Sequence, residues 1–258
     1  MGPPHDRRSG AGATSPFRQI QLGPQVFERP AVGNGLIGRD VKQEDGSDAM
    51  AIVAANGGSD LIYVPNRSAD VVQRITKLLT TLDYVGGIFV DDIYGNLPGA
   101  LPMSAVGLTG SSSVPHPAIV VAFKVFYQTP GDLQTAIQVS DASQQHGQGM
   151  HGGLGRDSTF NNMAAIGPDF KSRYVDLQPV SNTDIAPTIA LILGFEMPSH
   201  GRVITEALRG GAVRGAATAS RIESTPAGDR RTILYFHELG GIRYVDRGCY
   251  VEGTTCPQ

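Results

Sequence analysis

The chain has 258 residues, enough for one large domain or two small ones. Its net charge is −3 and it has no basic run and no Lys/Arg stripe, which argues against a nucleic-acid-binding protein. No segment is apolar over the length of a membrane span, and the first 16 residues lack the apolar core of a signal peptide. We therefore expect a globular protein that binds neither nucleic acid nor membrane.

The first half of the chain predicts an irregular start, a hairpin, a helix and a strand. Residues 1 to about 48 are rich in Gly, Pro, Ser and charge, and no apolar period holds there. Residues 50–54 and 61–64 read as strands joined by a turn at 56–58. In "SADVVQRITKLLTTLD" the apolar residues recur on one helical face, Ser68 is a plausible N-cap and Asp70 suits the first turn. A strand over 85–92 follows.

The second half predicts fewer regular elements. Residues 95–117 read as a loop with four prolines, and 118–127 as a strand rich in β-branched and aromatic residues. After a glycine-rich loop, 162–166 reads as a short buried strand. Residues 181–194 predict a helix, with caps at 181–184, Pro187 in its first turn and a stop at Gly194. Near the end, 231–246 predicts a β-hairpin turning at Gly240 and Gly241.

Strands and helices alternate, so the predicted fold class is α/β with a mixed sheet. Two good helices cover at least six predicted strands. That is few for a complete doubly wound domain, and it is the first indication that a layer is missing.

The glycine-rich loop holds the main candidate for chemistry, His151. Imidazole suits zinc and related ions, and the flanking glycines would let a substrate approach closely. A solvent-exposed loop histidine is the alternative, and a single histidine does not make a site. Nearby Arg156 could bind an anionic group through two hydrogen bonds, pair with Asp157, or face water.

Partners for His151 are not evident in the sequence. The chain contains no Asp-His and no Asp-x-x-x-His, and the pair Asp91 and Asp92 also reads as a turn. His200, just past the second predicted helix, is another candidate ligand. His116 and His146 lie in predicted loops, and His237 reads as a strand-face residue. A Gly-x-Ser-x-Gly elbow and a phosphate-binding P-loop are both absent.

The two cysteines, Cys249 and Cys256, leave alternatives open. Their spacing could close a small loop as a disulfide in an exported protein, or both thiols could be unpaired. A zinc site is less favoured, because no second Cys/His pair lies nearby in the sequence.

Several segments taken together resemble the alkaline phosphatase superfamily, in its nucleotide pyrophosphatase/phosphodiesterase-like branch. "MHGGLGRDSTFNNMAAIGPDFK" resembles the loop that carries the family's late His-Gly metal ligand. "PVSNTDIAPTIALILG" resembles the helix that follows, and "RVITEAL" its end. "AANGGSDLIYVP", "LDYVGGIFVDD" and "GALPMSAVGLTGSS" resemble the segments between the halves of the metal site. The resemblance runs from about residue 33 to about residue 246.

The resemblance implies a two-zinc phosphomonoester or phosphodiester hydrolase on an alkaline-phosphatase-like sandwich. In such enzymes a Thr or Ser nucleophile attacks phosphorus, and two metals activate it and stabilise the developing charge. One ligand carries over, His151, while His200 has no secure counterpart. The family's Asp-Gly ligand, nucleophile, Asp-x-x-x-His and Asp-His-Gly belong upstream of the matched region, and residues 1–32 contain none of them.

We therefore expect the C-terminal half of such a hydrolase, inactive without the N-terminal half that carries the remaining ligands. Its expected parts are an irregular segment at 1–32, the hydrolase half at 33–210, and a tail with a hairpin at 211–258. The resemblance also implies a periplasmic or secreted location, with any signal peptide on the missing half. The alternatives are a non-catalytic binding module, or sulfatase or cofactor-independent mutase chemistry within the same superfamily.

Overall fold

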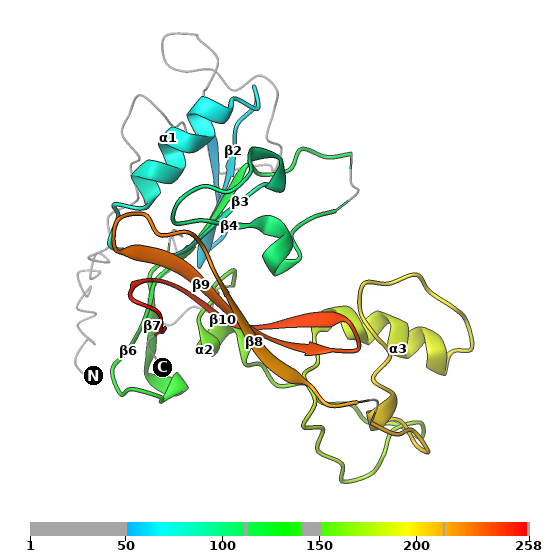
Figure 1. Ribbon diagram of the computed structural model, residues 1–258. Coiled ribbons are helices and arrows are strands. Elements are labelled where there is room, and N and C mark those ends of the chain that lie inside the picture. Colours follow the sequence, from blue (N-terminus) through cyan, green and yellow to red (C-terminus); the bar gives the residue numbers. More distant parts are fainter. Residues whose placement is uncertain (1–50, 111–112, 141–150, 214, 257–258) are drawn as a thin grey trace, which may run out of the picture.

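The computed structural model describes residues 51–110, 113–140, 151–213 and 215–256. The irregular segment expected at 1–32 lies outside these residues. The described chain forms two parts, which Figure 1 shows side by side. Residues 51–159 and 215–256 make a layered body, and residues 160–213 project from it as what we call the α3 lobe.

A five-stranded sheet forms the middle layer of the body. The strand order is β1-β2-β5-β3-β4, and all neighbours are antiparallel except β3 and β4, so the sheet is mixed, as predicted. The strands are β1 (Ile52–Ala55), β2 (Ser59–Tyr63), β3 (Val85–Val90), β4 (Leu101–Pro102) and β5 (Ile119–Phe123). Every residue of β3 and β5 is buried, because both faces of the sheet are covered.

The helix α1 (Ala69–Leu79) covers one face of this sheet. The backbone N–H of Val71 donates to Oγ of Ser68, so the predicted N-cap is confirmed. Its apolar stripe, which includes Val72, Ile75 and Leu79, is buried against Ile88 and other residues of that sheet face. The helical periodicity in the sequence therefore predicted both the helix and its buried side.

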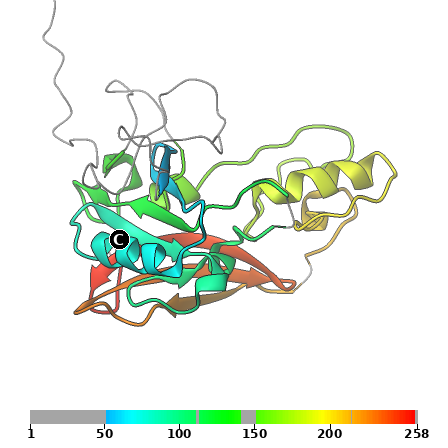
Figure 2. The same cartoon turned by 90° about the horizontal axis from the view of Figure 1, so that it is seen from above.

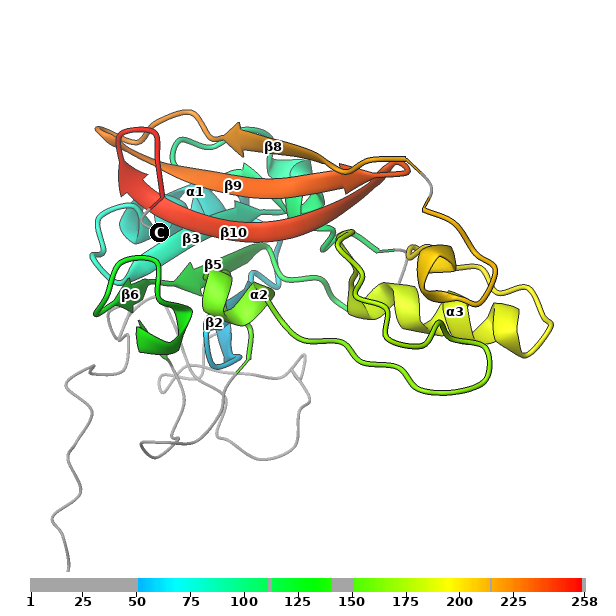
Figure 3. The ribbon, with the colours of Figure 1, turned by 90° about the horizontal axis from the view of Figure 1, so that it is seen from below.

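A C-terminal three-stranded antiparallel sheet covers the other face, in the order β10-β9-β8 (Figure 3). Its strands are β8 (Thr218–Glu223), β9 (Arg230–Leu239) and β10 (Ile242–Glu252). Leu234 and Phe236 of β9 pack against Phe89 and Val120 of the five-stranded sheet. The predicted hairpin turns at Gly240 and Gly241, whose φ values of +61° and +83° belong to a conformation that glycine favours.

The α3 lobe is built around the second predicted helix (Figure 2). A 3-10 turn, η4 (Asn182–Asp184), leads into α3 (Ile185–Ile192), and Ser181 and Asp184 form a capping box. Pro187 lies in the first turn and Gly194 follows the helix with a φ of +80°. The predicted start and stop signals are thus confirmed.

Two strand predictions are wrong in part or in whole. Residues 162–166 form no strand, and Ile166 is 99% exposed, because no described strand pairs with this apolar run. The predicted strand over 118–127 divides at Lys124 into β5 and β6 (Val125–Tyr127), and β6 pairs with β7 (Ala136–Gln138) in a separate ribbon.

The remaining helical elements are short. They are α2 (Arg156–Thr159), η1 (Asp92–Tyr94), η2 (Met103–Val106), η3 (Leu133–Thr135) and η5 (Thr205–Ala207). Among the described residues, no helix has the length and apolar character needed to cross a membrane.

Candidate functional site

Close backbone packing holds the loop that carries His151. The carbonyl oxygen of His151 accepts a 2.7 Å hydrogen bond from the N–H of Gly58, in the β1–β2 turn. At Gly152, with a φ of +86°, a Cβ atom would lie 2.6 Å from the carbonyl oxygen of Asn56 and 2.7 Å from Oγ of Ser59. Any other residue would force the loop away from the turn, so glycine at this position serves the packing that places His151.

The loop has a second anchor at a β-bulge in β10. The pairing of β10 with β9 shifts register between Val245 and Arg247, which leaves Asp246 as the extra residue. Nε of Arg156 lies 3.4 Å from Oδ1 of Asp246, and the hydroxyl of Thr159 donates to the carbonyl oxygen of Asp246. Bulges commonly redirect a side chain, and this one directs a carboxylate toward α2.

The His151 side chain itself is exposed on this anchored loop. Across the described ranges, no group of three or more His, Cys, Asp or Glu side chains is placed to hold a metal ion. A hydrolytic zinc site takes at least three protein ligands, so the residues described here do not form one by themselves. We derive no catalytic step from His151 alone.

Among the described residues, the other candidate histidines do not form a metal-binding group with His151. His200 is exposed and lines a cleft of about 980 Å³ between the α3 lobe and the tip of the β9–β10 hairpin. His237 is half-buried on β9, as expected for a strand-face residue, and His116 precedes β5. His146 lies outside the described residues.

Asp91 and Asp92 stabilise a turn. Oδ1 of Asp91 accepts a hydrogen bond from the N–H of Ile93 at 3.2 Å and caps η1. Oδ2 of Asp92 accepts from the N–H of Ser104 at 3.0 Å. Both carboxylates satisfy local donors, which favours the turn interpretation of this pair over a metal-ligand interpretation.

Arg156 begins α2 and is part of the anchor described above. Its guanidinium lies over the ring of Phe160, 5.2 Å from the centroid, and its side chain is 42% exposed. The carboxylate it contacts is Asp246, not its sequence neighbour Asp157, whose Oδ1 accepts a hydrogen bond from Tyr127. Asp246 lies on β10, far from Arg156 in the sequence, so local spacing could not have indicated this pair.

A buried polar network that the sequence did not reveal joins the α3 lobe to the body. Arg202 donates two hydrogen bonds to the carboxylate of Glu206, at 2.6 and 2.9 Å, and a third from Nε to the hydroxyl of Tyr244 on β10 at 3.0 Å. Glu206 is 1% exposed. The backbone N–H of Arg202 also donates to the fully buried Asp184, at 2.8 Å.

The titration behaviour of this network follows from burial and pairing. Burial alone would raise the pKa of Glu206, but its hydrogen bonds from Arg202 outweigh that effect and lower the pKa. Burial, assisted by the charge of Asp184, raises the pKa of Tyr244 to about 12. At neutral pH the Glu206 carboxylate is therefore ionised and Tyr244 is a neutral hydroxyl. The i, i+4 spacing of Arg202 and Glu206 was the one signal in the sequence that could have indicated the pair.

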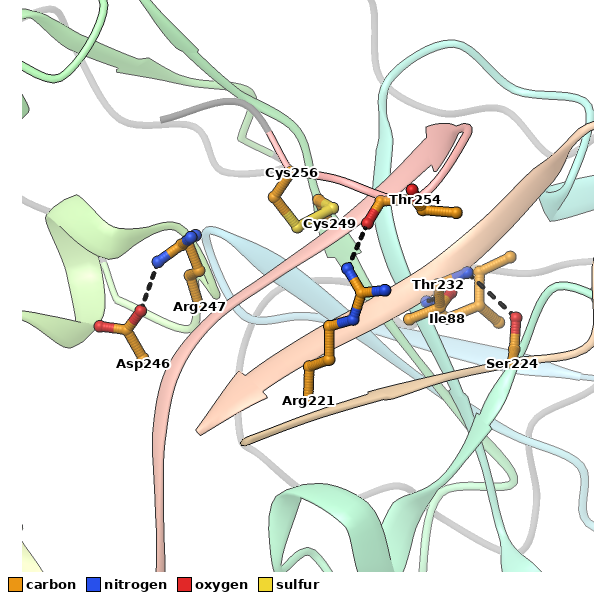
Figure 4. The surroundings of a disulfide bond; sticks show 9 residues. All are labelled: Ile88, Arg221, Ser224, Thr232, Asp246, Arg247, Cys249, Thr254 and Cys256. Atoms are coloured by element: carbon orange, nitrogen blue, oxygen red, sulfur yellow. Dashed lines mark hydrogen bonds and ion pairs between the residues drawn. A yellow bond between two sulfur atoms is a disulfide. The ribbon is translucent and has the colours of Figure 1, made fainter. Parts of the chain in front are cut away.

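The two cysteines form a disulfide bond with a Cα–Cα distance of 5.6 Å (Figure 4). Cys249 lies on β10, Cys256 follows it, and both are buried beside Ile233. Nη1 of Arg221 donates to the carbonyl oxygen of Thr254 at 2.7 Å and holds the same loop. Of the alternatives left open by the sequence, the structure has the disulfide.

Three comparisons, with protein-family models, with curated proteins and with solved structures, found no match to this chain. Any functional assignment therefore depends on the residues and geometry of the chain itself.

Proposed function

We propose that this chain is the C-terminal part of a two-metal phosphomonoester or phosphodiester hydrolase of the alkaline phosphatase superfamily. A complementary part would supply the nucleophile and the other metal ligands. The resemblance of the His151 loop and of the α3 segment gives the chemistry. The main structural support for a missing complementary part is that α3 exposes large apolar residues that the described chain does not cover.

The outer side of α3 is apolar over its whole length. We use the name α3 apolar face for Ile185, Ile189 and Leu193, which are between 40% and 67% exposed. Leu191 and Phe195 are exposed as well, but Leu191 points to a different side of the helix and Phe195 follows its end. Ile185, Ile189 and Leu193 recur every four residues and therefore lie along one side of the helix. The buried residues of this helix are instead Pro187, Thr188 and Ala190. An isolated apolar residue on a surface is ordinary, but a continuous stripe of this kind is typical of an interface.

The loop before α3 also exposes large apolar residues. Ile166, Val175 and Leu177 are 99%, 76% and 90% exposed. Ile166 belongs to the segment that resembles the late metal-ligand loop, and Val175 and Leu177 lie between that segment and the one that resembles the following helix. A complementary part packed here would bury them and would lie beside the segment that begins with His151.

His151 is suited to act as one ligand of a metal site that is completed by this complementary part. Glycine packing and the Arg156–Asp246 contact fix the backbone of its loop, while its imidazole is exposed. The backbone position is thus set by this chain, and the exposed imidazole is accessible to a metal whose other ligands, and the hydrogen bonds that would orient the ring, come from the complementary part. Arg156, five residues later, is the proposed contact for the anionic group of the substrate.

The test is an assay of the complete protein, in which this chain is joined to its complementary part. Zinc-dependent hydrolysis of p-nitrophenyl phosphate and bis-p-nitrophenyl phosphate is expected, and p-nitrophenyl sulfate would reveal a sulfatase-like member. His151→Ala should lower kcat/KM by about 100-fold or more, because loss of even an outer-shell partner of a metal costs roughly 10–100-fold. His237→Ala is the matched control. Full turnover and full zinc content in His151→Ala would exclude the ligand role.

A non-catalytic binding module is the second candidate. The body favours this candidate, because it has a hydrophobic core on each face of its sheet and a disulfide bond, and therefore has the features of a domain that folds without a second part. Size-exclusion chromatography of this chain with and without zinc separates the two. A binding module predicts a monodisperse monomer, whereas the hydrolase part predicts oligomers formed through the α3 apolar face.

A further inference from the structure

The body contains a second candidate site, a cavity of about 620 Å³ between β6 and the outer part of β10. Its walls are largely apolar and include Phe126, Tyr250, Val251 and the Cys249–Cys256 disulfide. Cavities of roughly 300–1,000 Å³ with apolar walls and a few polar groups commonly hold small organic molecules. The volume and the walls thus indicate a ligand with an apolar body.

The charged groups that line this cavity are mainly cationic. Four basic residues reach it, Lys124, Arg156, Arg230 and Arg247, against one carboxylate, Glu252. Nη2 of Arg230 is 3.3 Å from Oε1 of Glu252, so these two charges compensate each other at one end. The other two arginines in the lining are Arg156 and Arg247.

Arg156 and Arg247 share one carboxylate. Oδ1 of Asp246 is 3.4 Å from Nε of Arg156, and Oδ2 is 2.5 Å from Nη1 of Arg247, an arrangement that the bulge at Asp246 makes possible (Figure 4 shows the Asp246–Arg247 pair). Asp157, the other acidic residue nearby, accepts hydrogen bonds from Tyr127 and Ser158. Asp246 carries one negative charge and the two guanidinium groups carry two positive charges, so one positive charge remains without a balancing carboxylate in this group of three.

Both guanidinium groups also retain unused donors. Nε of Arg247 is buried and has no hydrogen-bond partner among the described residues, and Nε of Arg156 lies at ion-pair distance from Asp246 without the geometry of a hydrogen bond. The Arg247 side chain is only 14% exposed and its guanidinium lies over the ring of Tyr235, 4.3 Å from the centroid, which restricts its orientation. Buried donors without partners are uncommon in proteins, and a bound anion is one of the groups that satisfies them.

We infer that this cavity binds a small organic oxyanion, a carboxylate or phosphate monoester on an apolar body. The anionic group would accept hydrogen bonds from Arg156 and Arg247, and the apolar body would lie against Phe126 and the disulfide. Arg binds both kinds of oxyanion through paired N–H donors. This inference needs no metal, no nucleophile and no complementary part, but it uses Arg156, which the proposed hydrolase also uses. Arg247 and Phe126 belong to the cavity alone, so variants of these two residues test the cavity separately.

The test is isothermal titration calorimetry of the full chain, without added metal, against four probes. Benzoate and phenyl phosphate each carry an oxyanion on an apolar ring, and they distinguish a carboxylate from a phosphate ester. Inorganic phosphate lacks the apolar body and benzyl alcohol lacks the charge. Saturable binding of benzoate or phenyl phosphate is expected, with at least tenfold weaker binding of the other two probes. No saturable binding of either aromatic anion, or equal binding of benzyl alcohol, would overturn the inference.

Variants then locate the binding in this cavity. Arg247→Gln and Arg156→Gln should each weaken the preferred aromatic anion at least tenfold. Arg74→Gln is the matched control, because Arg74 also forms an ion pair, with Asp70, but on the exposed surface of α1. If a loss of folding accompanies Arg247→Gln, Phe126→Ser gives the same information, because Phe126 is 47% exposed and outside the core. Affinity unchanged in Arg156→Gln and Phe126→Ser would place the ligand elsewhere and refute the inference.

The binding experiment and the hydrolysis assay test different proposals. Anion binding by this chain without zinc supports the cavity site and does not test the hydrolase proposal. Zinc-dependent hydrolysis by the complete protein supports the hydrolase proposal and does not test the cavity site. Each experiment can fail while the other succeeds.

Discussion

The body and the α3 lobe use apolar residues in opposite ways. In the body, Ile88 and Ile119 face α1 and Phe89 faces the C-terminal sheet, and all three are fully buried. In the lobe, the residues that α3 buries are small, and its large apolar residues are exposed. An apolar sequence thus produces a core only where a second layer is present to cover it, and the lobe lacks such a layer within the described chain.

The two parts also differ in what stabilises them. Hydrophobic burial between sheets holds the body together. The lobe depends on the network of Arg202, Glu206, Asp184 and Tyr244, which joins it to β10. Polar networks of this kind fix a geometry but respond strongly to the loss of one member, since the remaining charge stays buried.

The largest expected effect contrasts the two parts directly. Phe89→Ala should lower the free energy of unfolding by about 3–5 kcal/mol, because it leaves a cavity between the two sheets. Leu193→Ala on the α3 apolar face should change it by less than about 0.5 kcal/mol, since Leu193 is 67% exposed. Urea denaturation followed by circular dichroism measures both. Similar losses in the two variants would mean that α3 is covered in this chain.

Breaking the lobe network should have the next largest effect. Arg202→Ala leaves the Glu206 carboxylate buried and unpaired, which costs roughly 3–5 kcal/mol in a fully buried pair and about 2–3 kcal/mol here, because Arg202 is partly exposed. Hydrogen exchange should increase over residues 181–206 and stay unchanged in β3 and β5. Arg202→Lys should show an intermediate effect, because lysine keeps the charge and loses the paired hydrogen bonds. Equal exchange in both parts would contradict the account.

Removing the disulfide should affect only the body. The double substitution of Cys249 and Cys256 by serine should cost about 2 kcal/mol, since the bond closes a short loop and longer loops gain more. Thermal unfolding of the body should shift downward while hydrogen exchange in the α3 lobe stays the same. A change confined to the lobe would show that the disulfide acts through a different contact.

The smallest effect concerns pH and Asp176, in the lobe. Burial raises the pKa of Asp176, and the charge of Glu206 adds to the increase. A carboxyl whose folded-state pKa is raised favours the protonated form, so folding loses stability as the pH rises from the unfolded-state pKa through the folded-state pKa. Asp176→Asn should therefore stabilise the lobe at neutral pH and give no advantage below both pKa values. Denaturation at pH 7 and pH 3 checks this, and an equal gain at both would exclude titration as the cause.

Sequence patterns predicted the elements whose signals are local. The apolar stripe and Ser68 predicted α1, the paired glycines predicted the β9–β10 turn, and the residues at 181–184 predicted the start of α3. Each of these signals depends on residues within a few positions of one another, so it can be recognised without knowledge of the tertiary fold.

Features that depend on distant contacts were missed. The apolar run at 162–166 resembles a buried strand, but no described partner is there to pair with it. Arg156 contacts Asp246 and Arg202 contacts Tyr244, and only the folded chain brings these pairs together. At the candidate site, the residue pattern indicated His151 as a candidate, but it did not show that Gly152 and the β10 bulge position its loop.

The central claim is that this chain is the C-terminal part of a metal-dependent hydrolase, and the most direct test is to read the coding sequence immediately upstream of the Met1 codon. The account predicts an open frame, or a neighbouring gene, that encodes an Asp-Gly, a Thr or Ser nucleophile, an Asp-x-x-x-His and an Asp-His-Gly. A stop codon and a ribosome-binding site directly before Met1, with no such gene nearby, would contradict it and leave the binding module as the function of this fold.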